Sequence, residues 1–242
     1  MLRLKGLYAV AVGVIALFGG HQALAEGIEQ VYRYDAPSTD GIGKFYMGRE
    51  ISHVMGHQGA AWLERAGRVR QERSDLVIKH LPVEEDSVVA DIGAGTGFFT
   101  FPVAERVPSG RVYAVDIQQE MLDIVLSKRQ ARGVVNVEPV LGAETRLNIA
   151  DESLDLAFVV DAYHEFSHPF EMGQSIFAAL KPGGRFVLIE YRAEDPGVPI
   201  KPLHKMSERQ VGREMAALGF VWERTARFLP QQHFIVFMKP GA

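Results

Sequence analysis

The 242-residue sequence contains no cysteine, which excludes disulfide bonds, thiolate metal sites and cysteine nucleophiles. It also lacks a long run of lysine or arginine, and its formal net charge is −4 at pH 7. No nucleic-acid partner is therefore expected, since such proteins gather positive charge on one face. One arginine-rich stretch alternates with acidic residues and predicts a solvated helix face; its members are Arg65, Arg68, Arg70 and Arg73. Apolar residues make up 47% of the chain, enough for one packed domain.

Residues 1–25 have the pattern of a secretory signal peptide. Arg3 and Lys5 precede an apolar run over 7–18, and small residues stand at alternate positions in 23–25. The run of about twelve residues is short for a bilayer span, which needs roughly twenty. Export to the periplasm is the first expectation. The alternatives are an uncleaved membrane anchor, or a misassigned start codon and a cytoplasmic protein.

Residues 26–82 predict a leader followed by a helical cap. Over 42–81, apolar residues such as Ile51 and Trp62 recur at helix-like spacing, and Pro82 ends the region. The expectation is a helical N-terminal extension beside the main domain.

Residues 83–242 predict an α/β domain in which strands alternate with helices. This order implies a doubly wound sheet whose parallel strands are joined by right-handed crossovers. The expected strands are 88–92, 111–116, 137–141, 154–160 and 186–191, and the expected helices are 98–107, 119–132, 170–180 and 207–218. Two final strands, 220–228 and 233–239, have a short link and predict an antiparallel hairpin. The sheet is therefore expected to be mostly parallel with an antiparallel C-terminal end.

A glycine-rich turn follows the first strand of this domain. Gly93, Gly95 and Gly97 allow the main chain to approach a ligand because they carry no side chain. Asp116 closes the next strand, where a carboxylate can accept both ribose hydroxyls of an adenosine cofactor. The spacing differs from the G-x-G-x-x-G of dinucleotide sites, and Asp91 before the turn suits a cationic ligand better than a diphosphate.

With this turn, the Asp116 strand, the Lys-Pro-Gly-Gly turn at 181–184 and the final hairpin, residues 83–239 resemble class I methyltransferases that use S-adenosylmethionine (SAM). The likeness is greatest to the small-molecule branch that includes quinone-biosynthesis enzymes. It implies a Rossmann-like fold with SAM as cofactor, whose methionine part lies against Asp91 and the three glycines. It further implies that Asp116 holds the ribose and Ile117 packs on the adenine. Many relatives have Gly-Asp-Ala after the third strand; here Glu144 is the candidate contact of the adenine amino group.

The fourth strand ends in a polar segment, Asp161 to Glu165, where open α/β sheets bind their ligands. Asp161 is assigned to the cofactor and Tyr163 to the substrate pocket. An oxygen or protonated nitrogen loses a proton on methylation, so His164 is the expected base, with Glu165 orienting or replacing it. The alternative is that His164 only shapes the pocket.

Glu190, at the end of the fifth strand, and His204, from a later loop, are expected in the wall of the substrate pocket. His164 to His168 also matches H-E-x-x-H, which binds zinc when it lies on a helix. Pro169 disfavours the α conformation at His168, so no metal site is expected.

The sequence thus predicts SAM-dependent methyl transfer to a small, apolar or aromatic acceptor by in-line displacement, in which alignment supplies much of the rate. A non-catalytic SAM- or nucleoside-binding module and an H-E-x-x-H zinc hydrolase are the alternatives. The expected partner is a small molecule, with membrane contact only through an uncleaved N-terminus. No oligomeric state is predicted.

Overall fold

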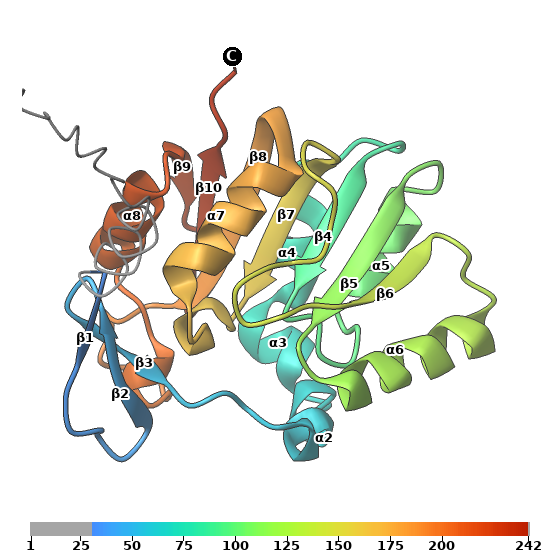
Figure 1. Cartoon of the computed structure of the whole chain (residues 1–242). Helices are drawn as coiled ribbons and strands as arrows, with labels where there is room; N and C mark the ends of the chain where they lie inside the picture. Colours follow the sequence, from blue (N-terminus) through green and yellow to red (C-terminus); the bar gives the residue numbers. More distant parts are fainter. Residues whose placement is uncertain (1–30, 242) are drawn as a thin grey trace, which may run out of the picture.

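The computed structural model describes residues 31–241 (Figure 1). The predicted signal peptide or anchor, residues 1–25, lies outside the described residues. Within 31–241, none of the helices combines the length and the hydropathy that crossing a membrane requires.

A seven-stranded sheet forms the centre of the structure (Figure 1). Its strands, in spatial order, are β6 (Val137–Leu141), β5 (Arg111–Asp116), β4 (Val88–Ile92), β7 (Leu154–Val160), β8 (Leu180–Tyr191), β10 (Gln232–Met238) and β9 (Val221–Ala226). The first five run parallel, and β10 pairs antiparallel with both β8 and β9. The predicted α/β fold with an antiparallel C-terminal hairpin is therefore confirmed.

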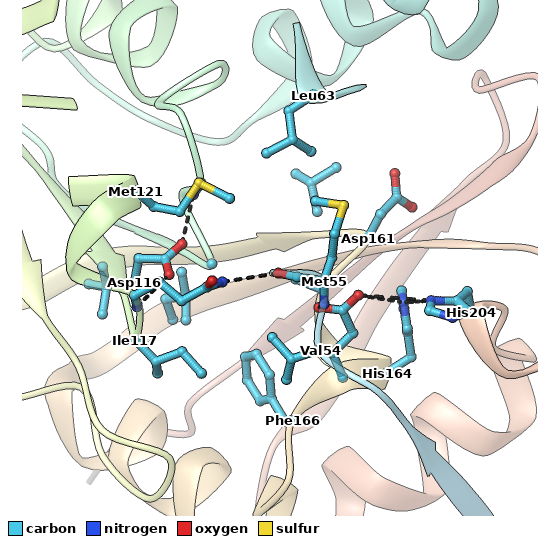
Figure 2. Close-up of a pocket in the computed structure, with 18 of the residues that line it drawn as sticks. Val54, Met55, Leu63, Asp116, Ile117, Met121, Asp161, His164, Phe166 and His204 are labelled. Atoms are coloured by element: carbon cyan, nitrogen blue, oxygen red, sulfur yellow. Dashed lines mark hydrogen bonds and ion pairs between the residues drawn. The ribbon is translucent and has the colours of Figure 1, made fainter. Parts of the chain in front are cut away.

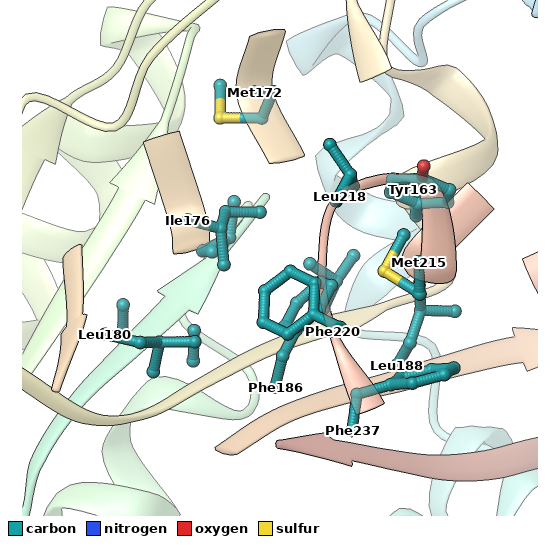
Figure 3. Close-up of a cluster of buried hydrophobic side chains, with 14 of the residues drawn as sticks. Tyr163, Met172, Ile176, Leu180, Phe186, Leu188, Met215, Leu218, Phe220 and Phe237 are labelled. Atoms are coloured by element: carbon teal, nitrogen blue, oxygen red, sulfur yellow. The ribbon is translucent and has the colours of Figure 1, made fainter. Parts of the chain in front are cut away.

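Both faces of the central strands are buried, as expected for parallel strands between layers of helices. Successive side chains of β8 alternate between two core clusters: Phe186 and Leu188 enter one, Val187 and Ile189 the other. Figure 3 shows the first cluster. Helices α7 (Pro169–Ala179) and α8 (Glu208–Ala217) contribute to it, whereas α4 (Ser74–His80), α5 (Thr100–Arg106) and α6 (Gln119–Arg132) contribute to the other.

Local sequence signals fix the bounds of several elements. The Ser207 hydroxyl accepts the Gln210 main-chain N–H at 3.1 Å and caps α8 as predicted. Helix α6 ends at Gly133, which adopts a positive φ of 63°. Strand β8 begins earlier than expected, because Leu180 already pairs with Leu154 before a register shift.

The helical cap expected over 42–81 is wrong in its first part. Strands β2 (Gly41–Tyr46) and β3 (Arg49–Ser52) lie there instead of helix. With β1 (Tyr32–Tyr34), which falls in the segment expected as a leader, they form an antiparallel sheet. Met47 and Gly48, both at positive φ, make the two-residue turn between β2 and β3, which is the geometry that favours a hairpin. Helical structure begins later, with η1 (His57–Gly59), α2 (Ala60–Leu63) and α3 (Arg68–Glu72).

A buried ion pair fixes this small sheet to the main domain. Arg49 of β3 donates from Nε to Oε1 of Glu214 at 2.9 Å and from Nη2 to Oε2 at 3.0 Å. Its Nη1 also donates to the main-chain carbonyl of His164 at 3.1 Å. The N-terminal sheet is thereby held against α8 and against the polar segment that follows β7.

Candidate active site

A cavity of about 510 Å³ lies at the carboxyl ends of β4, β5 and β7. Gly93, Asp116 and Asp161, which follow or end these strands, line it. The link between β3 and α2 passes along the same edge and contributes Val54 and Met55 (Figures 1 and 2). Open α/β sheets bind their ligands in this position.

The glycine turn and Asp116 form one hydrogen-bonded unit. The Gly95 N–H donates to Oδ2 of Asp116 at 2.9 Å, and the Gln118 N–H donates to Oδ1 at 2.9 Å. Gly93 and Gly95 both have positive φ, and a Cβ at Gly95 would lie 2.7 Å from the Leu63 side chain. Burial raises the pKa of Asp116, although the two main-chain donors oppose this effect. The turn therefore presents bare main chain to the cavity beside a fixed carboxyl group.

Two residues predicted to contact the cofactor lie elsewhere. Asp91 is 3% exposed and its Oδ2 accepts the Thr100 hydroxyl at 2.6 Å, beneath the turn. Burial raises the pKa of Asp91 to about 7. Among the residues described, Asp91 is not part of the cavity lining, and Gly97 lines a second, smaller cavity beside α5. In this structure Asp91 links the end of β4 to the first residue of α5 and so stabilises the turn between them.

The two residues predicted to contact the adenine of the cofactor, Ile117 and Glu144, both line the cavity. Ile117 lines the cavity and is 42% exposed, so one of its faces is free to pack on a flat ligand. Glu144 also lines the cavity, and its carboxylate lies 3.2 Å from Nδ1 of His168.

Asp161 occupies a strained position at the end of β7. Its φ of 50° is unusual for a residue with a side chain and costs on the order of 1 kcal/mol. Its Oδ2 accepts from Nε2 of Gln232 at 3.1 Å, while Oδ1 is buried with no hydrogen-bond partner among residues 31–241. Burial, with repulsion from Glu72 and Glu190, raises its pKa well above the usual range. This carboxyl oxygen is thus buried and unpaired among the described residues.

Arg68 lines the cavity and was missed as a site residue. The solvated helix face predicted around it is wrong at this position, because Arg68 is 4% exposed and pairs with Glu72, Nε to Oε2, at 2.9 Å. Glu72 also accepts the Tyr191 hydroxyl at 2.8 Å. The four-residue spacing of Arg68 and Glu72 signalled the pair, but not its burial.

The opposite end of the cavity holds a cluster centred on His164 (Figure 2). Its Nδ1 donates to Oε2 of Glu190 at 2.6 Å, because an ionised carboxylate can only accept. Its Nε2 lies 3.1 Å from Nδ1 of His204 and 3.8 Å from Oε1 of Glu165. The structure thus brings three of the predicted residues together at the cavity wall, and Glu190 stands behind them, fully buried.

The charge states in this cluster depend on one another. Burial alone lowers the pKa of His164, but attraction to Glu190, helped by Glu165 and Asp161, outweighs it and raises the pKa. Burial and repulsion from His164 lower the pKa of His204. Burial raises the pKa of Glu165.

The helix that the H-E-x-x-H motif requires does not form. Tyr163–Glu165 makes only the 3-10 turn η2, and His168 precedes Pro169 in a non-helical conformation. Tyr163 itself is fully buried in the core and, within the described chain, is not a wall of the cavity.

Comparisons with known proteins find similarity to methyltransferases. Residues 89–184 match the family model described as a methyltransferase domain. An uncharacterized methyltransferase-like protein of Schizosaccharomyces pombe is 31% identical over 161 residues, which cover 66% of this chain and 59% of that one. The demethylmenaquinone methyltransferase of Lactococcus lactis is 33% identical over 141 residues, covering 57% and 54%. The chain thus spans somewhat more than half the length of these relatives.

The fold has solved counterparts as well. The crystal structure of a SAM-dependent methyltransferase from Aquifex aeolicus superposes with a TM-score of 0.72 at 24% identity. The superposition covers 76% of this chain and 99% of that one.

Proposed function

We propose that this chain, which carries a class I SAM-dependent methyltransferase domain, transfers the methyl group of SAM to a small, apolar or aromatic acceptor. The observation that carries the proposal is one cavity with Asp116 at one end and His164 at the other (Figure 2). The first end has the chemistry to hold an adenosyl group, and the second has the chemistry to take a proton.

The cofactor is proposed to lie along the glycine turn. Asp116 accepts the ribose hydroxyls, Ile117 packs on the adenine, and Glu144 accepts from the adenine amino group. The main chain at Gly93 and Gly95 lies against the methionine part, where a side chain would block it.

The charged end of the methionine part needs two complementary partners. The Arg68 guanidinium lines the cavity and suits a carboxylate. The free Oδ1 of Asp161 suits the ammonium group. These two residues face the same cavity as the glycine turn, which supports a zwitterionic ligand in this orientation.

The remaining wall favours an apolar acceptor. Apolar side chains line the cavity between the two ends: Val54, Met55, Phe166, Met172 and Ile200. The name of the Lactococcus lactis relative specifies a demethylmenaquinone, which supports a quinol-like ring as acceptor class here. Apolar acceptors of this kind partition into membranes. We therefore keep export or membrane anchoring through residues 1–25 as part of the proposal, since either would bring the chain close to such an acceptor.

The reaction is proposed as an in-line displacement. The acceptor atom, an oxygen, a nitrogen or an activated ring carbon, forms the new bond to the methyl carbon, and the sulfur leaves with the electron pair of the broken bond. The acceptor proton passes to Nε2 of His164, whose other nitrogen is fixed by Glu190. Glu165, whose Oε1 lies 3.8 Å from Nε2 of His164, orients this base or replaces it.

The test is a titration and a turnover assay on the same preparation. Calorimetry with SAM should show one binding site, and methyl-tritiated SAM should label a quinol or a phenol from a panel of acceptors. His164→Ala should retain SAM affinity and lose turnover, while His80→Ala, exposed and stacked on Phe228, serves as control. SAM binding without transfer to any acceptor would instead support a non-catalytic module.

A further inference from the structure

Three metal-ligating side chains converge at the wall of the cavity. Nε2 of His164, Nδ1 of His204 and Oε1 of Glu165 are separated by 3.1, 3.8 and 3.8 Å. They come from the turn after β7 and from η3 (Pro202–His204), on segments about forty residues apart. We propose that these three residues form a binding site for a divalent transition-metal ion of the zinc class.

The separations fit ligands of one ion. Zinc lies about 2.0–2.2 Å from imidazole nitrogen and carboxylate oxygen, so two ligands in tetrahedral geometry are roughly 3.4 Å apart. The observed distances of 3.1 and 3.8 Å lie on either side of that value. Ions of the zinc class readily bind two imidazoles and a carboxylate. Calcium and magnesium instead prefer ligand sets made of oxygen alone.

The outer contacts leave the inner atoms free. Glu190 accepts from Nδ1 of His164 at 2.6 Å, which directs the lone pair of Nε2 toward His204. The Met55 N–H donates to Oε2 of Glu165 at 3.2 Å and leaves Oε1 facing the two histidines. Metal sites characteristically hold their ligands by such outer hydrogen bonds.

Charge and access also suit a cation. Glu165 and Glu190 place two carboxylates beside the imidazoles. Two basic side chains of neighbouring elements are engaged by carboxylates, Arg49 by Glu214 and Lys201 by Asp40, although Lys201 still repels a charge on His204. All three proposed ligands line the cavity, so the ion retains an open position for a further ligand.

The site goes beyond the proposed methyl transfer and does not depend on it. A bound ion would take the Nε2 lone pair that His164 uses as a base, so the metal-loaded and metal-free chains are two distinct forms of the cavity. Metal binding can therefore be measured without SAM or an acceptor.

The experiment uses untagged full chain, stripped with a chelator and titrated with zinc by calorimetry. Binding of one equivalent is expected, with at least tenfold weaker affinity in His204→Ala and in Glu165→Gln. Cobalt(II) should give the visible absorption of a four- or five-coordinate ion with nitrogen ligands. His204 and Glu165 are partly exposed, so both variants are expected to fold. A melting curve and a SAM affinity close to those of the wild type check this.

His168→Ala is the matched control. His168 is the second histidine of the H-E-x-x-H string, but its Nδ1 lies against Glu144 and Ser167. Its replacement should leave zinc affinity unchanged. Failure of the wild-type chain to bind one equivalent, or equal loss in the His168 and His204 variants, would overturn the proposed site while leaving the methyl-transfer proposal standing.

Discussion

Glu190 holds His164 by two hydrogen bonds, accepting Nδ1–H at 2.6 Å with one oxygen and the main-chain N–H at 3.2 Å with the other. The first bond fixes which ring nitrogen of His164 carries the proton. The second holds the main chain of His164 within the turn η2 (Tyr163–Glu165). Because Glu190 is fully buried on β8 while His164 follows β7, two adjacent parallel strands define the orientation of this ring.

Replacing Glu190 with Gln should lower kcat for methyl transfer at least roughly tenfold while leaving the KM for SAM unchanged. The amide can still accept the His164 N–H, but it loses the charge that favours the Nδ1–H tautomer. Nitrogen-15 NMR of His164 should report a changed tautomer population. Glu223→Gln, on the edge strand β9 and paired with Arg185, is the control. An unchanged kcat with a changed tautomer would show that His164 is not the base.

Asp116→Asn should weaken SAM binding by about a hundredfold, since the variant loses a charged acceptor for two ribose hydroxyls, each worth roughly 1.5 kcal/mol. Some stability should be lost with it, because the same carboxyl group accepts the main-chain N–H groups of Gly95 and Gln118. Calorimetric titration with SAM measures the first effect and urea unfolding the second. Asp123→Asn, exposed on α6, should change neither. Wild-type SAM affinity in Asp116→Asn would refute the ribose assignment.

The central sheet could be predicted from the sequence because its signals are local. Strands β4 to β7 have the expected bounds, since each is a short segment rich in apolar residues with glycine or polar residues near its ends. The N-terminal sheet was mistaken for helix because apolar residues such as Ile51 fit both periodicities. The deciding signal was the Met47–Gly48 turn, whose positive φ values only the folded hairpin reveals.

In the site, too, local sequence signals predicted some residues, while tertiary contacts placed others. Knowing that ligands lie at the carboxyl ends of strands was enough to bring Asp116, Asp161 and His164 to one cavity. It was not enough to place Arg68 there, because the burial of Arg68 depends on Glu72, one of whose further partners, Tyr191, is 119 residues away. Such tertiary contacts have no local sequence pattern.

Gly95→Ala should destabilise the fold by about 1–2 kcal/mol, the cost of a side chain at φ +53°. SAM affinity should also fall at least tenfold, because the new Cβ would displace the Leu63 side chain that lines the cavity. Gly212→Ala is the matched control: it lies within α8 at negative φ with open space around it. That variant should gain roughly 0.5–1 kcal/mol, seen as a higher Tm. Equal effects of the two substitutions would contradict the role of the turn.

The buried carboxyl of Asp91 should make the stability of the fold depend on pH. Its folded pKa is about 7, above the ordinary 3.8, chiefly because of burial. Between these values the folded chain keeps a proton that the unfolded chain has lost, so the contribution of Asp91 to stability falls as pH rises. The whole free-energy cost of ionising the buried Asp91 carboxyl is therefore present only above about pH 7.

Asp91→Asn removes this penalty while keeping an oxygen that can accept the Thr100 hydroxyl. Urea unfolding should therefore show that the variant gains about 2–3 kcal/mol relative to wild type between pH 5 and pH 8. The other buried acids, Asp116 among them, are common to both proteins, so most of their own pH dependence cancels in the difference. Asp123→Asn should follow the wild-type curve. If the Asp91→Asn and wild-type curves run parallel from pH 5 to pH 8, Asp91 is already ionised in the folded chain over this range and its pKa is not raised.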